Sequence, residues 1–172
     1  STRGVFRAGK STNDNWHLDN NGEYSGAFGL DNKVLGDYSF SAGRDNQVTK
    51  ELSIVGSGKD NQVMHRASGV FTGESNQIEL TSDSTGGGYS AIVSGKNNVV
   101  KGDYGFIGSG MSNQIKENPM YASILGGTNN KIEGSNSSHS AILGGSNNYV
   151  FGAYSFALGQ YAHVSSLGTY HD

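Results

Sequence analysis

Two columns of small or branched apolar residues recur along this chain at intervals of about 14 residues. In the first column, Val or Ile stands two residues after a repeated asparagine, and a glycine stands three residues before that asparagine. The members of this column are Val34, Val48, Val63, Ile78, Val100, Ile115, Ile132, Val150 and Val164. The second column lies two residues after a repeated serine, at Ala27, Ser41, Val55, Val70, Ile92, Ile107, Ile124, Ile142 and Ala157.

The residues around each column predict short strands separated by turns. In 36–48, a run that alternates from Ser39 to Ala42 is followed by a glycine turn and a second short run at 46–48. Two such strands cannot form a stable hairpin alone, but copies stacked in parallel pair at about 4.8 Å. Because β-branched residues suit this arrangement and helical periodicity is absent from 25–164, we predict an all-β β-solenoid.

The spacing of the repeat defines the organisation of the chain. Successive asparagine positions are separated by 14, 15, 15, 22, 15, 17, 18 and 14 residues, and Ala162 takes the asparagine position in the ninth copy. This predicts about nine stacked coils of 14–15 residues, with one extra residue in the longer type, as in a β-bulge. We expect a lead-in segment at 1–23, a β-roll at 24–168 and a tail at 169–172.

Composition and charge narrow the classes of partner. The 27 glycines hold repeat-fixed turn positions, so the low hydrophobic content of 34% does not indicate disorder. The net charge of −3, with no basic stripe, argues against nucleic acid, and a chain without cysteine has no disulfide or thiolate site. The sequence has no apolar run of about 18 residues, so we expect no membrane insertion by this chain. We also interpret the chain as a fragment of a longer protein.

The repeated asparagine is interpreted as structural. Asparagine tolerates left-handed backbone, bonds to neighbouring main chain at turns, and stacks into ladders. The five histidines share no metal-ligand spacing, and no nucleophile elbow, P-loop or dinucleotide fingerprint occurs. We therefore expect no catalytic residues, cofactor or metal, although the stretch Gly-Gly-Ser-Asn-Asn leaves calcium open because it is similar to part of calcium-binding nonapeptide repeats.

Two motifs carry a resemblance to a known family. Gly-x-Tyr-Ser-Phe-x-x-Gly occurs at 36–43 and 152–159, and Ile-Leu-Gly-Gly-x-Asn-Asn occurs at 124–130 and 142–148. The array resembles the head repeats of trimeric autotransporter adhesins of the YadA type, and similar arrays occur in phage tail-fibre-like and viral surface proteins. The resemblance implies a left-handed parallel β-roll in which three chains pack around a common axis.

A second argument for a homotrimer comes from the positions beside the interior column. Neighbours along a strand point to opposite faces, so apolar residues next to that column are exposed in a monomer and covered in a trimer. These positions hold Phe28, Phe71, Val93, Leu125, Leu143 and Leu158.

Three intervals exceed the basic coil, namely Leu80–Gly88, Lys116–Met120 and Gly134–His139. All fall at the same place in the repeat, so we expect loops on one edge, where repeat proteins often bind partners. Exposed tyrosines suit contact with a glycan or a protein, although the same tyrosines could instead stabilise the stack. The candidate receptor-contact residues are Ser82, Asp83, Ser84, Tyr89, Tyr104, Tyr121, Asn136 and His139.

These observations favour a non-enzymatic adhesin head or fibre module that presents a receptor-binding surface to a host cell or matrix. The resemblance places it outside the cell, on a bacterial surface or on a phage or virus particle, with a host-surface glycan or protein as its partner. Two alternatives stay open: a purely structural stalk, and a polysaccharide depolymerase that works in grooves of a trimeric fibre.

Overall fold

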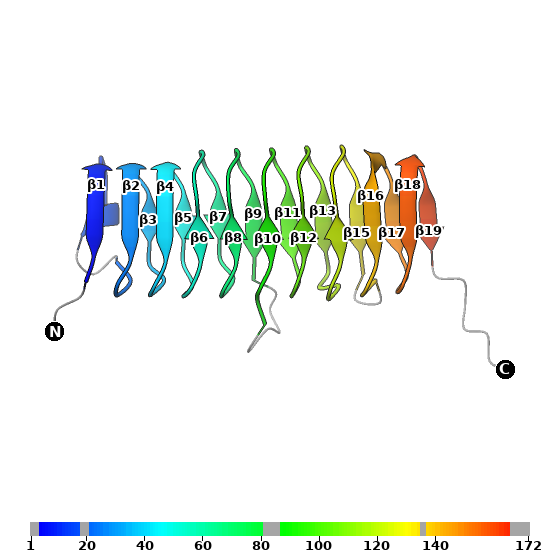
Figure 1. The fold of residues 1–172 in the computed structure, drawn as a ribbon, viewed down its shortest axis with the longest axis horizontal. Helices are drawn as coiled ribbons and strands as arrows, with labels where there is room; N and C mark the ends of the chain where they lie inside the picture. Colours follow the sequence, from blue (N-terminus) through cyan, green and yellow to red (C-terminus); the bar gives the residue numbers. More distant parts are fainter. Residues whose placement is uncertain (1–3, 18–20, 81–86, 135–136, 166–172) are drawn as a thin grey trace.

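The computed structural model describes residues 4–17, 21–80, 87–134 and 137–165, which wind into a β-solenoid of two parallel sheets (Figure 1). One turn contributes one strand to each sheet, and the strands stack from the N-terminal to the C-terminal end. The predicted all-β solenoid of about nine turns is confirmed, whereas its trimeric assembly and its left-handedness stay predictions.

Ten strands form the first sheet, called sheet A, and nine form the second, called sheet B. Sheet A contains β1 (Phe6–Lys10), β2 (Gly26–Leu30), β4 (Phe40–Arg44), β6 (Ile54–Val55), β8 (Gly69–Val70), β10 (Ala91–Ile92), β12 (Phe106–Ile107), β14 (Ser123–Ile124), β16 (Ala141–Ser146) and β18 (Phe156–Gln160). Sheet B contains β3 (Lys33–Val34), β5 (Gln47–Val48), β7 (Gln62–Val63), β9 (Gln77–Glu79), β11 (Val99–Lys101), β13 (Gln114–Lys116), β15 (Lys131–Glu133), β17 (Tyr149–Phe151) and β19 (His163–Ser165).

The core lies between the sheets and consists of the two predicted columns. Val100 and Ile115 pair in register across β11 and β13, and Ile92 and Ile107 pair across β10 and β12. These side chains are fully buried, while Val164, in the last strand, is only partly buried. Since one column comes from each sheet, a single layer of Val, Ile and Ala side chains fills the interior.

A ladder of buried asparagines runs along one side of this core. The Nδ2 of Asn98 donates to Oδ1 of Asn76 at 3.0 Å and to the carbonyl of Gly110 at 3.0 Å. The backbone N–H of Asn98 also donates to Asn76, and Oδ1 of Asn98 accepts from the N–H of Asn113. Each amide thus satisfies main-chain groups of adjacent turns, which confirms the structural interpretation of this repeat.

Coil length controls the length of the sheet A strands. The predicted extra residue appears in β16, whose register against β18 shifts between Ile142 and Gly145. Where coils of the shorter type pair with one another, as in β2 and β4, the strands run for five residues without a break. In the longer coils the ladder is reduced to a two-residue strand followed by an isolated bridge, such as that between Lys59 and Glu74.

The N-terminal segment closes one end of the solenoid. Strand β1 lies within the expected lead-in segment and pairs with β2, and there Arg7 takes the position of the interior column. Its guanidinium donates to Asn21 and Ser25, and partial burial lowers the pKa of Arg7. The 3-10 helix η1 (Asp14–Trp16) places Trp16 against sheet B, where its Nε1 donates to the carbonyl of Asn32 at 3.1 Å.

Candidate functional site

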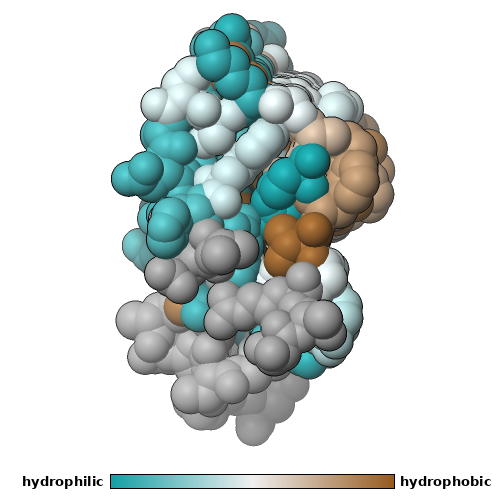
Figure 2. Space-filling view, turned by 90° about the vertical axis from the view of Figure 1, so that its left-hand side faces the viewer, coloured by the Kyte–Doolittle hydropathy of each residue, from teal (hydrophilic) through white to brown (hydrophobic). Residues whose placement is uncertain are grey.

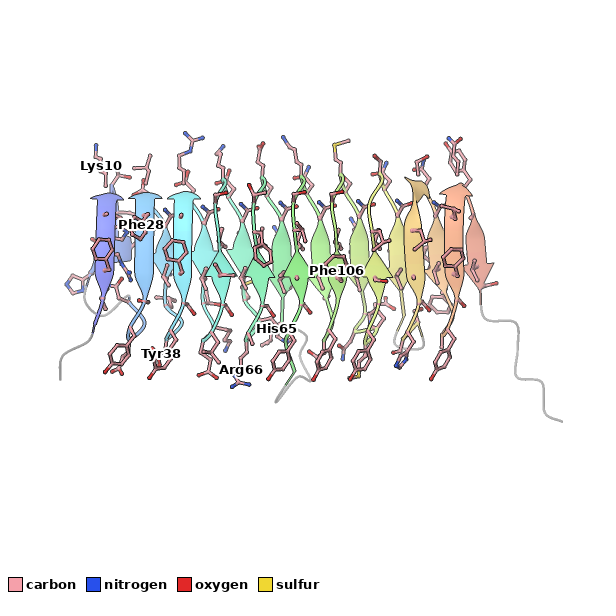
Figure 3. The ribbon with its side chains drawn as sticks, viewed as in Figure 1. Lys10, Phe28, Tyr38, His65, Arg66 and Phe106 are labelled. Carbon is pink, nitrogen blue, oxygen red and sulfur yellow. The ribbon has the colours of Figure 1, made fainter. Side chains whose placement is uncertain are left out.

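The edge at which sheet B leads back into sheet A carries a ladder of aromatic rings, and we call it the aromatic edge. Tyr38 projects from this edge at the bottom of Figure 3. Its equivalents all adopt left-handed backbone with φ between 48° and 60°. These residues are Tyr24, Tyr38, Leu52, Ala67, Tyr89, Tyr104, Tyr121, His139 and Tyr154.

Four of the predicted receptor-contact residues come together in this ladder. Tyr89 stacks on Tyr104 at 5.4 Å between ring centroids, Tyr104 on Tyr121 at 4.6 Å, and Tyr121 on His139 at 5.0 Å. Tyr154 extends the stack beyond His139 at 5.0 Å. The other four candidates, Ser82, Asp83, Ser84 and Asn136, lie outside the described residues.

The stacking determines which parts of the tyrosine rings a ligand can contact. A non-glycine residue in the left-handed region is unfavourable, and each stacked aromatic pair offsets that cost by about 0.5–1.5 kcal/mol. Inside the stack, both faces of the rings of Tyr104 and Tyr121 contact neighbouring rings. This supports the alternative in which the tyrosine column stabilises the fold, and it leaves only ring edges and hydroxyls for a ligand.

All three insertions leave the solenoid at the aromatic edge, as predicted. The first insertion is bounded by Leu80, which directly follows β9, and by Gly88, which directly precedes Tyr89 of the aromatic edge, while 81–86 lie outside the described residues. The segment Lys116–Met120 turns through Glu117 and Asn118, which both have positive φ. In the third insertion, Ser138 accepts a hydrogen bond from the backbone N–H of Met120. The second and third insertions therefore contact each other.

A buried histidine lies beneath the first insertion. Nε2 of His65 lies 3.3 Å from Oδ1 of Asp103, across the turn that contains Gly87 and Gly88. A Cβ at Gly87 would overlap the Asp103 carboxylate, so any other residue at this position would displace Asp103. Burial lowers the pKa of His65 and outweighs the opposing effect of Asp103. The pair joins turns that are not adjacent.

A pocket of about 410 Å³ opens beside this pair, and sequence reasoning did not find it. It is lined by Asp37, Lys50, Glu51, His65 and Arg66, together with Leu35, Gly36, Thr49, Leu80 and Gly87. Nε of Arg66 donates to Glu51 at 2.5 Å, which raises the pKa of Arg66, with smaller contributions from Tyr89. These positions differ in residue type from coil to coil, so they give no repeat signal.

The outer face of sheet A carries a continuous apolar surface, which we call the apolar strip. Each coil contributes one large residue beside a small one, except the last coil, which contributes two large ones. Small residues make room for large neighbours: a Cβ on Gly26 would lie 3.1 Å from the ring of Phe40. The strip consists of Phe6, Phe28, Phe40, Ile54, Phe71, Val93, Phe106, Leu125, Leu143, Phe156 and Leu158.

The predicted exposure of the strip in a single chain is confirmed. Phe71 is 52% exposed, Leu125 48% and Leu158 61%. Figure 2 shows the hydrophobic colouring gathered on the side that forms the front of Figure 1, while much of the opposite side is hydrophilic. Phe28 and Phe106 both lie on this front face in Figure 3.

The outer face of sheet B differs in charge. Lys101 pairs with Glu79 at 2.7 Å, and Lys131 pairs with Glu133 at 2.5 Å. Although partial burial acts the other way, hydrogen bonds from Lys131 and from the Tyr149 hydroxyl lower the pKa of Glu133. This face therefore suits contact with water.

Two absences among the described residues concern metal binding and membrane spanning. In 4–17, 21–80, 87–134 and 137–165, no group of three or more His, Asp or Glu residues is arranged to hold a metal ion. Within the same residues, no helix has the length and hydrophobicity needed to span a membrane.

Comparison with known proteins does not assign a family. No protein-family model matches the chain, and no curated protein matches its sequence. The resemblance to YadA-type head repeats therefore rests on the repeat motifs themselves.

Proposed function

We propose that this chain is a non-enzymatic module of a trimeric surface fibre, an adhesin-like head that presents a receptor-binding surface to a host cell or matrix. The observation that carries the proposal is the apolar strip, which follows sheet A through ten strands. Ten strands at about 4.8 Å spacing make a strip roughly 43 Å long. An exposed apolar surface of this extent marks an interaction site.

Other copies of this chain are the proposed cover for the strip. The number three and the extracellular setting, on a bacterial cell or on a phage or virus particle, follow from the resemblance to YadA-type heads. With sheet A turned towards the axis, sheet B and the aromatic edge face outwards. The three insertions would then stand on the exposed side of the fibre, where a host-surface glycan or protein can reach them.

Sedimentation of the purified chain at micromolar concentration tests the assembly. The expected species has three times the 18.1 kDa mass of one chain. A folded, β-rich monomer under these conditions would contradict the trimer.

Attachment is tested separately, on a glycan array and on host cells. Binding should be lost when 80–88 and 134–139 are shortened while the trimer persists. Release of saccharide from a host polysaccharide by the isolated chain would instead overturn the non-enzymatic assignment and favour the depolymerase.

A purely structural stalk is the second candidate, and the ring stacking favours it. If the aromatic edge only stabilises the solenoid, shortening the insertions will not change attachment of the complete fibre to host cells. Binding by this chain alone would exclude the stalk.

A further inference from the structure

The aromatic ladder is interrupted in the middle of the solenoid. Tyr24 and Tyr38 stack at 5.3 Å, and the second stack begins at Tyr89. The two coils between them carry Leu52 and Ala67 at the ladder position. Among the described rings, none stacks on the face of Tyr89 that is turned towards Ala67. The interruption thus leaves two successive coils without a ring at a position where the fold otherwise supplies one.

The pocket of about 410 Å³ lies beside this interruption. Asp37, Glu51 and Arg66 line it, and each directly precedes one of the ladder positions Tyr38, Leu52 and Ala67. In Figure 3, Tyr38 and Arg66 project from the aromatic edge, and His65 lies further inside the solenoid. Ligand pockets span about 300–1,000 Å³, so a monosaccharide or a disaccharide fits this volume.

The polar groups of the pocket include cationic donors as well as carboxylate acceptors, and this combination suits a ligand that carries a carboxylate together with hydroxyls. Nε of Arg66 donates to Glu51, and the guanidinium also interacts with the Tyr89 side chain, so two neighbours hold it in place. Within the described part of the chain, Lys50 forms no ion pair, and its charge and that of Arg66 balance the carboxylates of Asp37 and Glu51 in the lining. Asp37 is held in place by the backbone N–H of Glu23 at 2.7 Å, so its carboxylate is a preoriented acceptor.

The apolar part of the lining suits a ring face. Leu35 and Leu80 also line the pocket, and Leu80 is 46% exposed. Saccharide rings present an apolar C–H face together with hydroxyl edges. The pocket is built from the ends of sheet B strands and the aromatic edge, so it stays open when the apolar strip is covered.

We infer that this pocket binds a sugar ring that carries a carboxylate, with Lys50 and Arg66 holding the carboxylate and Asp37 and Glu51 accepting hydroxyl hydrogens. The inference rests on the proposed function, because it names the ligand class of the receptor-binding surface. It differs from the expectation that the stacked tyrosines contact the receptor, because it places recognition in the part of the aromatic edge that carries no rings.

Titration of the full chain by NMR provides the test, with methyl β-D-glucuronide and N-acetylneuraminic acid as two sources of the same chemistry. Saturable shifts are expected at the amides of Thr49, Glu51 and Arg66, with a Kd of about 1 mM. Methyl β-D-glucoside, which lacks the carboxylate, and acetate, which lacks the ring, should each bind about tenfold more weakly, equivalent to about 1.4 kcal/mol.

Arg66→Ala and Lys50→Ala should each weaken binding of the acidic sugar by about tenfold. Arg44→Ala is the matched control, because Arg44 is a half-exposed arginine paired with Asp45 on the opposite edge, and it should change the Kd by less than about twofold. Circular dichroism checks the fold of each variant, and Lys50→Gln replaces Lys50→Ala if the latter does not fold.

The inference is overturned if the folded protein shows no saturable shift with either acidic sugar at about 20 mM. It is equally overturned if the neutral sugar or acetate binds as tightly, or if Arg66→Ala and Arg44→Ala behave alike. None of these results would alter the sedimentation of the chain or its attachment through the insertions. Failure of the pocket and failure of the proposed function are therefore distinguishable.

Discussion

The two outer faces of the solenoid share one backbone geometry but carry opposite chemistry. Both sheets pair in parallel, turn for turn, and both bury one residue per coil in the same core. Sheet A then presents a large apolar residue in every coil, whereas sheet B presents mostly amides, lysines and glutamates, with Val99, Tyr149 and Phe151 as exceptions. Since the interior is equivalent on both sides, the fold does not require this difference. The outward positions of sheet A are thus available to specify assembly.

The largest difference between the two faces is expected when a negative charge is placed on each of them in turn. Leu125→Asp on sheet A should abolish the trimer, because an unpaired buried charge costs about 3–5 kcal/mol. Gln114→Asp on sheet B, which faces the opposite way, should leave assembly unchanged. Sedimentation of both variants measures the effect. An intact Leu125→Asp trimer would show that the apolar strip is not the interface.

A substitution in the shared interior should affect both faces together. Asn98→Ala removes hydrogen bonds to Asn76, Gly110 and Asn113 and leaves their buried groups unpaired. The expected loss in free energy of unfolding is about 3 kcal/mol. Denaturant unfolding measures it, and hydrogen exchange should accelerate in both sheets.

The neighbouring asparagine supplies the control for that experiment. Asn97 is exposed and has a φ of 57°. Asn97→Gly keeps a residue that tolerates this backbone, so its effect should stay within about 1 kcal/mol. Equal destabilisation by both variants would contradict a special role for the ladder.

Filling the inner side of sheet A should stabilise the chain. Ser41 occupies an interior-column position, is fully buried, and its Oγ has no hydrogen-bond partner among the described residues. Ser41→Val should raise the free energy of unfolding by about 1 kcal/mol, because it removes an unsatisfied hydroxyl from an apolar site. Thermal unfolding measures this, with Ser39→Val as the contrast. The Ser39 hydroxyl bonds to Lys50 and Ser53, so its loss should destabilise the chain.

The smallest effect is expected on the outer side of sheet B. Lys101 and Glu79 pair across adjacent strands with substantial exposure of both side chains. Lys101→Ala should change the free energy of unfolding by no more than about 1 kcal/mol, since exposed ion pairs contribute little. A double-mutant cycle with Glu79→Ala isolates the pair. A larger coupling would mean that this face is covered rather than solvated.

The sequence was most informative where the same contact repeats in every turn. Val100 and Ile92 recur with the coil period, so both interior columns, the asparagine ladder and the exposure of the apolar strip were predictable. The extra residue at Gly144 was likewise predictable as a bulge, because it changes coil length without disturbing the columns.

The structural features that could not be predicted from the sequence depend on single residues and on contacts between distant parts of the chain. Arg7 ends the interior column with a charge, and its partners Asn21 and Ser25 carry no repeat signal. His65 lies close to Asp103 across a segment in which Gly87 has no side chain to separate them. The pocket contains Lys50, Glu51 and Arg66, which are not repeated at the equivalent positions of most coils, so periodicity could not identify it.

The closed N-terminal end has a consequence for how the chain is made. Nε1 of Trp16 donates a hydrogen bond to the carbonyl of Asn32, which would otherwise accept one from a preceding sheet B strand. At this end of sheet B the carbonyl is thus already used, and the stack continues from here towards the C-terminal end, in the direction in which a ribosome delivers the chain. The first turns can act as a template while later turns are still being synthesised, and each new coil needs only its predecessor to fold. The cap thus gives folding a direction as well as a starting point.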